Sequence, residues 1–177
     1  MLNPKIRRIT ILVCMAVLCG CSGYEGEPAA APVYTIEGEP VQLDVEGENS
    51  TTWMMKNAAG DLNGDGQDDH AAVLSQNTGG TGVFYYLNVF LNDGKDGWQF
   101  VGEEFLGDRI KFDFLDIYAE GSVSQLTDVP IHPDDYGQLV VAYATHTVEQ
   151  SFAEEPGNYL TRHFKVQDGS LVALDAD

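Results

Sequence analysis

The chain has 177 residues and a formal net charge of −19, with 28 acidic residues against nine Lys and Arg. Nucleic-acid binding needs Lys and Arg clustered against the phosphates, so this excess of acid excludes it. The same charge favours a cationic protein partner or divalent cations, with solubility of a surface protein as the plain alternative.

The first 20 residues are typical of a bacterial signal peptide. Lys5, Arg7 and Arg8 form a positively charged start, and the apolar run Ile9–Leu18 follows it. This run is shorter than the ~20 residues that a membrane-spanning helix needs. A short apolar run after a basic start is the secretory pattern, so we predict that residues 1–20 are a leader removed on export.

The leader ends in Leu18-Cys19-Gly20-Cys21, which resembles the lipobox of bacterial lipoproteins. The resemblance implies that Cys21 receives diacylglyceryl and becomes the new N-terminus; the alternative is an ordinary signal peptide with a chance cysteine. Lipidation would supply at least two acyl chains, which is enough for stable anchoring to a membrane. Ser22, rather than Asp, follows the cysteine, and in Gram-negative lipoproteins this favours the outer membrane.

Removal of the leader changes both the cysteine count and the charge. Cys14 and Cys19 leave with it, so Cys21 remains as the sole cysteine, and a disulfide, thiol catalysis or a Cys-ligated zinc site is excluded. Six basic residues then face 28 acidic ones, a net charge of −22. Residues 21–35 are predicted to be the lipidated N-terminus and a flexible tether. Residues 36–177 are predicted to be a single β-rich domain.

The predicted domain is all-β, with at most a minor helix that would make it α+β, because no window shows a sustained helical spacing of apolar residues. Val83–Leu91 is dense in β-branched and aromatic residues and is too apolar on both faces for an edge strand. Turn chemistry at 93–97 leads into a partner strand from Trp98. Further strands are predicted at 41–43, 53–55, 71–74, 110–117, 138–147, 159–166 and 171–174, with a bulge in 110–117 where the apolar phase slips. Strands in sequence with tight turns predict an antiparallel meander, curved into a sandwich or a barrel-like sheet.

One segment, the loop 61–69, contains residues that can bind a metal ion. Counted from its first residue, side chains with oxygen atoms fall at positions one, three, five and nine, with glycine at position six. Calcium takes six to eight oxygen ligands, and a tight loop can direct alternate side chains at it. The predicted ligands of a structural calcium ion are Asp61, Asn63, Asp65, the backbone carbonyl of Gln67, and Asp69. The alternative is a turn rich in Asn and Asp that binds no metal.

The loop is similar to the calcium loops of FG-GAP and VCBS repeats, which follow the pattern D-x-[DN]-x-D-G-x-x-D before a strand. It is not an EF-hand, because Ala72 stands where the bidentate Glu of that motif belongs. Only one copy is present, so a propeller is not implied. Over residues 60–172 the chain also resembles a group of small and largely uncharacterised bacterial secreted proteins and lipoproteins. This resemblance implies no particular activity for the chain.

The sequence therefore predicts an envelope lipoprotein with a non-enzymatic binding or structural module, stabilised by calcium and suited to a cationic partner. Two other functions stay open. The first is a metal-dependent hydrolase that uses His146 and His163 with nearby carboxylates. The second is surface adhesion or carbohydrate binding through exposed aromatic residues such as Trp53 and Trp98.

Overall fold

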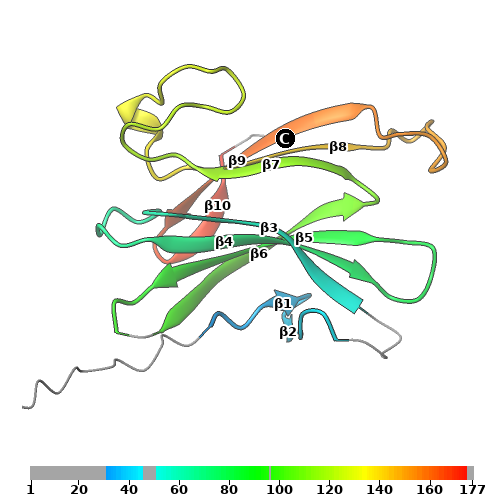
Figure 1. Cartoon of the computed structure of the whole chain (residues 1–177), viewed down its shortest axis with the longest axis horizontal. Helices are drawn as coiled ribbons and strands as arrows, with labels where there is room; N and C mark the ends of the chain where they lie inside the picture. The colour runs from blue at the N-terminus through cyan, green and yellow to red at the C-terminus, as the bar shows by residue number, and fades with distance from the viewer. Residues whose placement is uncertain (1–30, 46–50, 96, 175–177) are drawn as a thin grey trace, which may run out of the picture.

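The computed structural model describes residues 31–45, 51–95 and 97–174, and it shows two four-stranded antiparallel sheets with a small hairpin (Figure 1). The leader, Cys21 and residues 22–30 of the predicted tether lie outside the described residues. The first sheet contains β3 Thr51–Gly60, β4 Asp69–Asn77, β5 Phe84–Asn92 and β6 Trp98–Asp108. The second contains β7 Lys111–Ile117, β8 Leu139–Thr145, β9 Asn158–Gln167 and β10 Ser170–Ala173. The hairpin pairs β1 Thr35–Ile36 with β2 Glu39–Pro40, and the only helical turn among the described residues is the 3-10 turn Pro133–Asp135.

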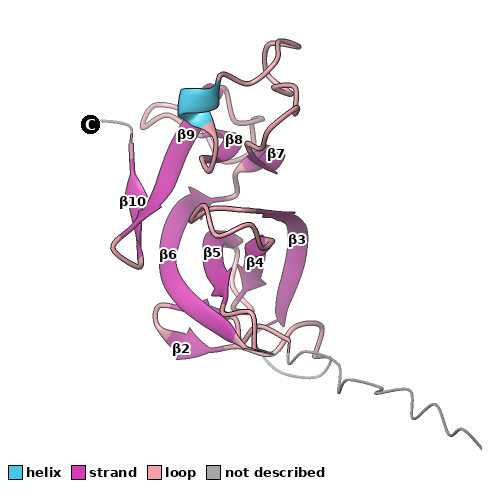
Figure 2. Ribbon diagram, turned by 90° about the vertical axis from the view of Figure 1, so that its left-hand side faces the viewer, coloured by secondary structure: helices cyan, strands magenta, loops and turns pink. Residues whose placement is uncertain are grey.

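Each sheet is a meander in which neighbours along the chain are neighbours in space. The orders are β3-β4-β5-β6 and β7-β8-β9-β10, and all the pairs are antiparallel. The chain passes from one sheet to the other at the short connection between β6 and β7. Figure 2 shows the two sheets one above the other, so the prediction of an antiparallel all-β fold of sandwich type is confirmed.

The main hydrophobic core lies between the sheets, and its buried members come from six of their eight strands and from two of the connections. Its buried members are Leu62, Ala71, Val73, Leu87, Val89, Val101, Leu106, Ile110, Leu115, Ile117, Leu139, Val141, Tyr143 and Phe164. The tenth strand adds Leu171, which is partly buried against this core. Alternate residues of each strand face this layer, as the two-residue period of a strand requires.

Both sheets are also covered on their outer faces, each by an irregular segment. On the first sheet, Ile36 and its neighbours pack on Leu74 and Tyr86. On the second, the connection after β7 packs Tyr118 and Ile131 on β8. The inner strands β4, β5 and β8 are therefore buried on both faces, which explains why Val83–Leu91 is apolar apart from Asn88 and confirms that it is not an edge.

The predicted strand positions agree with the structure in most places. The bulge expected in 110–117 is confirmed, because the register with β8 shifts between Phe112 and Phe114. The strand predicted at 41–43 is wrong, since only Leu43 forms an isolated bridge, with Thr52. The strand predicted at 53–55 is part of the longer β3. No helix in the described part of the chain is long and apolar enough to cross a membrane.

Candidate functional site

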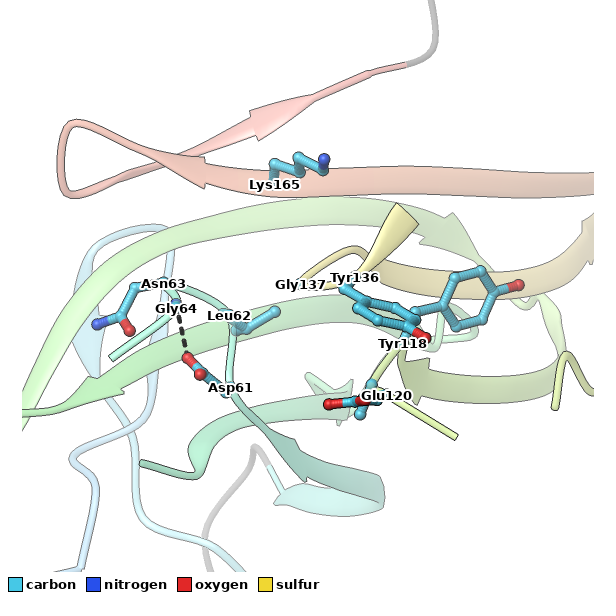
Figure 3. A pocket seen from close by; sticks show the side chains of 10 residues that line it. Asp61, Leu62, Asn63, Gly64, Tyr118, Glu120, Tyr136, Gly137 and Lys165 are labelled. Atoms are coloured by element: carbon cyan, nitrogen blue, oxygen red, sulfur yellow. Dashed lines mark hydrogen bonds between the residues drawn. The ribbon is translucent and has the colours of Figure 1, made fainter. Parts of the chain in front are cut away.

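The loop predicted to bind calcium connects β3 to β4 and is held together by its own polar side chains. The carboxylate of Asp61 accepts the N–H of Gly64 at 2.7 Å (Figure 3) and that of Gly66 at 2.9 Å. Asn63 Oδ1 accepts the N–H of Asp65 at 2.9 Å, and Asp65 Oδ1 accepts that of Gln67 at 2.8 Å. The bonds accepted by Asn63 and Asp65 are Asx turns, in which a side chain accepts the backbone N–H two residues further on, whereas Asp61 reaches three and five residues along the loop.

Two glycines give the loop its curvature. Gly64 and Gly66 have φ values of 81° and 84°, in the left-handed region that residues with a Cβ avoid. Asn63 and Asp65 are exposed at the tip of the loop. The predicted ligands Asp61, Asn63 and Asp65 are therefore brought together at one exposed turn.

Asp69 takes a different position from the other predicted ligands, because its side chain is fully buried. Its Oδ2 accepts the N–H of Leu62 at 2.8 Å, and its Oδ1 accepts the N–H of Asn92 at 2.9 Å. Burial raises the pKa of Asp69, the two N–H donors oppose this rise, and the negative charges of Asp65 and Asp61 add to it. Asp69 thus joins the two ends of the loop and ties them to the end of β5.

The fit of this loop to a calcium ion depends on oxygens other than carboxylates. Within the described residues, no group of three or more His, Cys, Asp and Glu side chains is arranged to hold a metal ion. A carboxylate oxygen that accepts one N–H still has a lone pair free, so Asp61 and Asp65 keep the capacity to bind a cation. The Asn63 amide oxygen, the Gln67 carbonyl and water would have to complete the shell that a hard cation requires.

A cavity of about 600 Å³ lies beside the loop (Figure 3). Its lining comes from the loop, from the connection after β7 and from β9: Asp61, Leu62, Asn63, Gly64, Tyr118, Ala119, Glu120, Tyr136, Gly137 and Lys165. Lys165 Nζ donates to the carbonyl of Asp134 at 3.1 Å. No sequence pattern groups these residues, because they come from three separate segments that only the folded chain brings together.

The two histidines of the hydrolase hypothesis lie at opposite ends of the second sheet. His163 pairs with Val140, whereas His146 follows Thr145 at the far end of β8. Six residues of extended strand span about 20 Å, too far for two ligands of one ion. His163 contacts Gln138 Oε1 at 3.0 Å, and His146 contacts the carbonyl of Glu154 at 2.9 Å. The fold does not bring these residues together.

The two tryptophans of the adhesion hypothesis also lie apart. Trp53 is in β3 and Trp98 in β6, the two outer strands of the first sheet. Trp53 pairs with Ser75, near the end of β4, while Trp98 pairs with Asn92, at the other end of the sheet. Trp53 is 41% exposed, and Trp98 is half-buried beside His70. They do not form one surface.

Comparisons of the chain with protein-family models, with curated proteins and with solved structures gave no match.

Proposed function

We propose that this chain is an envelope lipoprotein, anchored to the outer membrane through Cys21, whose β-sandwich is a non-enzymatic module that binds a cationic partner. The lipobox Leu18–Cys21 supports the anchor. The observation that carries the binding role is the charge, 28 acidic against nine basic residues on a chain of this size. A surface of one dominant sign attracts partners of the other sign and raises their association rate.

We further propose that the loop 61–69 binds calcium and that the ion stabilises the fold. Asp61, Asn63 and Asp65 would supply side-chain oxygens and Gln67 its carbonyl. Asp69 would contribute through the loop that it holds in place or as a further ligand. The ion would offset the repulsion between acidic side chains that lie close together. It would act as a structural cross-link between β3 and β4, which flank the loop.

The expected size of the effect follows from binding linkage. Extracellular calcium modules have Kd values of about 0.1–1 mM. With ~1 mM calcium and a Kd of ~0.1 mM, binding to the folded state alone adds about 1.4 kcal/mol to the free energy of unfolding. For a domain of this size this raises Tm by about 5 °C.

The test compares thermal melts in calcium and in EDTA for the wild type, Asp65→Ala and Asp68→Ala. Asp68 is exposed in the same loop but is not among the predicted ligands, so it controls for the loss of one negative charge. We expect calcium to raise the Tm of the wild type and of Asp68→Ala, but not that of Asp65→Ala. Identical melts of all three proteins with and without calcium would show that the loop is only a turn.

A further inference from the structure

A second cavity, of about 470 Å³, lies on the outer face of the first sheet, next to the β1–β2 hairpin. Three aromatic rings line it, those of Phe84 and Tyr86 from β5 and of Phe105 from β6. Tyr86 and Phe105 face each other across the two strands, with ring centroids 5.3 Å apart, and Phe84 lies 6.5 Å from Phe105. Phe105 is 52% exposed and Phe84 is half-buried, whereas Tyr86 is buried, so Phe105 and Phe84 form the part of the aromatic wall that is open to solvent.

Two carboxylates stand beside these rings, and the hairpin fixes one of them. Glu103 Oε1 accepts the N–H of Glu37 at 2.8 Å, and its Oε2 accepts the hydroxyl of Thr35 at 2.9 Å. Glu37 itself occupies the tip of the hairpin with a φ of 54°, next to Gly38 at 78°. Glu37 lines the same cavity as Glu103, and its negative charge acts on the Tyr86 side chain.

The electrostatic character of the cavity follows from its lining. Besides the rings and the two carboxylates it contains only Gln76 and Thr78, and none of the described lining residues is basic. Burial raises the pKa of Tyr86, and the negative charges of Glu37 and Glu103 raise it further. The field of both carboxylates therefore reaches the aromatic wall.

Aromatic faces beside carboxylates that have no cationic partner are complementary to an organic cation. The ring faces attract an ammonium or guanidinium group, and the carboxylates neutralise its charge. An anion would be repelled, and a neutral apolar ligand would leave the negative charges of both glutamates without a counter-charge.

We propose that this cleft receives a lysine or arginine side chain of a basic protein partner. The inference rests on the proposed binding function and gives that function a site, defined by Glu37, Phe84, Tyr86, Glu103 and Phe105. The net charge of −19 favours a macromolecule over a small ammonium compound. A protein with many basic groups is attracted by the electrostatic field of the whole domain, whereas a single positive charge is attracted only weakly.

The test measures binding of a fluorescent oligolysine peptide to the full chain by anisotropy, at low salt and at about 0.15 M ionic strength. The site variants are Phe105→Ala and Glu37→Gln. Their matched controls are Phe100→Ala, a 42% exposed ring on the same strand, and Glu39→Gln, an exposed glutamate in the same hairpin. Circular dichroism checks that all four variants are folded.

We expect each site variant to raise Kd by about two- to fivefold, the range given by one exposed cation–π or ionic contact. The controls should leave Kd close to that of the wild type. If site and control variants bind equally well, diffuse charge holds the peptide, and the cleft is not the site although the proposed function stands. If the wild type does not bind the peptide even at low salt, the proposed cationic partner falls as well. A separate titration uses tetramethylammonium in place of the peptide. If tetramethylammonium binds in a way that depends on Phe105 while the peptide does not bind, the ligand is a small ammonium compound and the proposed protein partner is overturned.

Discussion

Substitution of Asp69 by Asn tests whether the buried carboxylate holds the loop 61–69 in place. Both of its oxygens accept backbone N–H groups, one from Leu62 and one from Asn92. An Asn side chain has one acceptor oxygen and an NH₂ group that can only donate. One of the two N–H groups would therefore face another donor inside the protein.

The magnitude is the balance of two effects. A buried polar group left without a partner costs about 1–3 kcal/mol, and here both the N–H and the new NH₂ group lose partners. Part of this loss is offset because a neutral amide is easier to bury than a carboxylate. Burial disfavours the charged form of Asp69 and so raises its pKa. We expect a net loss of about 2 kcal/mol, which corresponds to a fall in Tm of about 8 °C.

The assay is a thermal or urea melt in EDTA, so that bound calcium contributes nothing. Asp68→Asn is the matched control, since Asp68 is exposed, neighbours Asp69 and loses the same charge. We expect this control to melt within about 2 °C of the wild type, as surface substitutions do. Equal melting of Asp69→Asn and Asp68→Asn would refute the role assigned to the buried carboxylate.

Two further predictions concern other parts of the chain. Burial would raise the pKa of Asp108, but hydrogen bonds from Arg109 and from the N–H of Val83 outweigh it, and the pKa lies below its ordinary value of 3.8. The stabilisation from this lowered pKa is fully present above pH 3.8 and is lost as the pH falls through the folded-state pKa. Asp108→Asn should therefore lower the free energy of unfolding, measured by urea denaturation, by about 1 kcal/mol at neutral pH and by less at acid pH; a loss that does not change with pH would contradict this. Cys21→Ser should move the chain from the membrane fraction to the soluble fraction and abolish incorporation of labelled fatty acid, and a variant that still partitions with membranes would contradict the lipid anchor.

Much of the fold could be predicted because the chain forms two meanders. In such a fold, turns and alternation along the sequence decide which strands pair. The slip in apolar phase near Phe112 marked a real bulge. The full length of β3 was missed, since an edge strand with Lys56 and Asn57 lacks a continuous apolar pattern.

The covering of the outer faces was harder to predict. Asn88, inside an apolar strand, is fully buried, and its side chain accepts the N–H of Thr35 at 2.8 Å and donates to its carbonyl at 3.0 Å. A buried polar side chain requires partners, so this single Asn was the available signal that another segment packs there. Its partner lies in the predicted tether, where Tyr34 also contacts His70 and Phe90. Sequence alone could not say which segment would supply those contacts.

The anchor and the cleft place a limit on where a partner can meet this protein. Tyr34, the first described residue that packs on the first sheet, comes 13 positions after Cys21. A fully extended chain of that length spans at most about 45 Å, so with the proposed anchor the start of the hairpin would stay within that distance of the lipid headgroups. Anionic headgroups repel an acidic domain, but only over about 8 Å at physiological ionic strength. In the proposed anchored state, the repulsion would keep the cleft off the membrane surface and the short connection to Cys21 would keep it near, which would favour a basic partner held at the same envelope layer over one that diffuses freely.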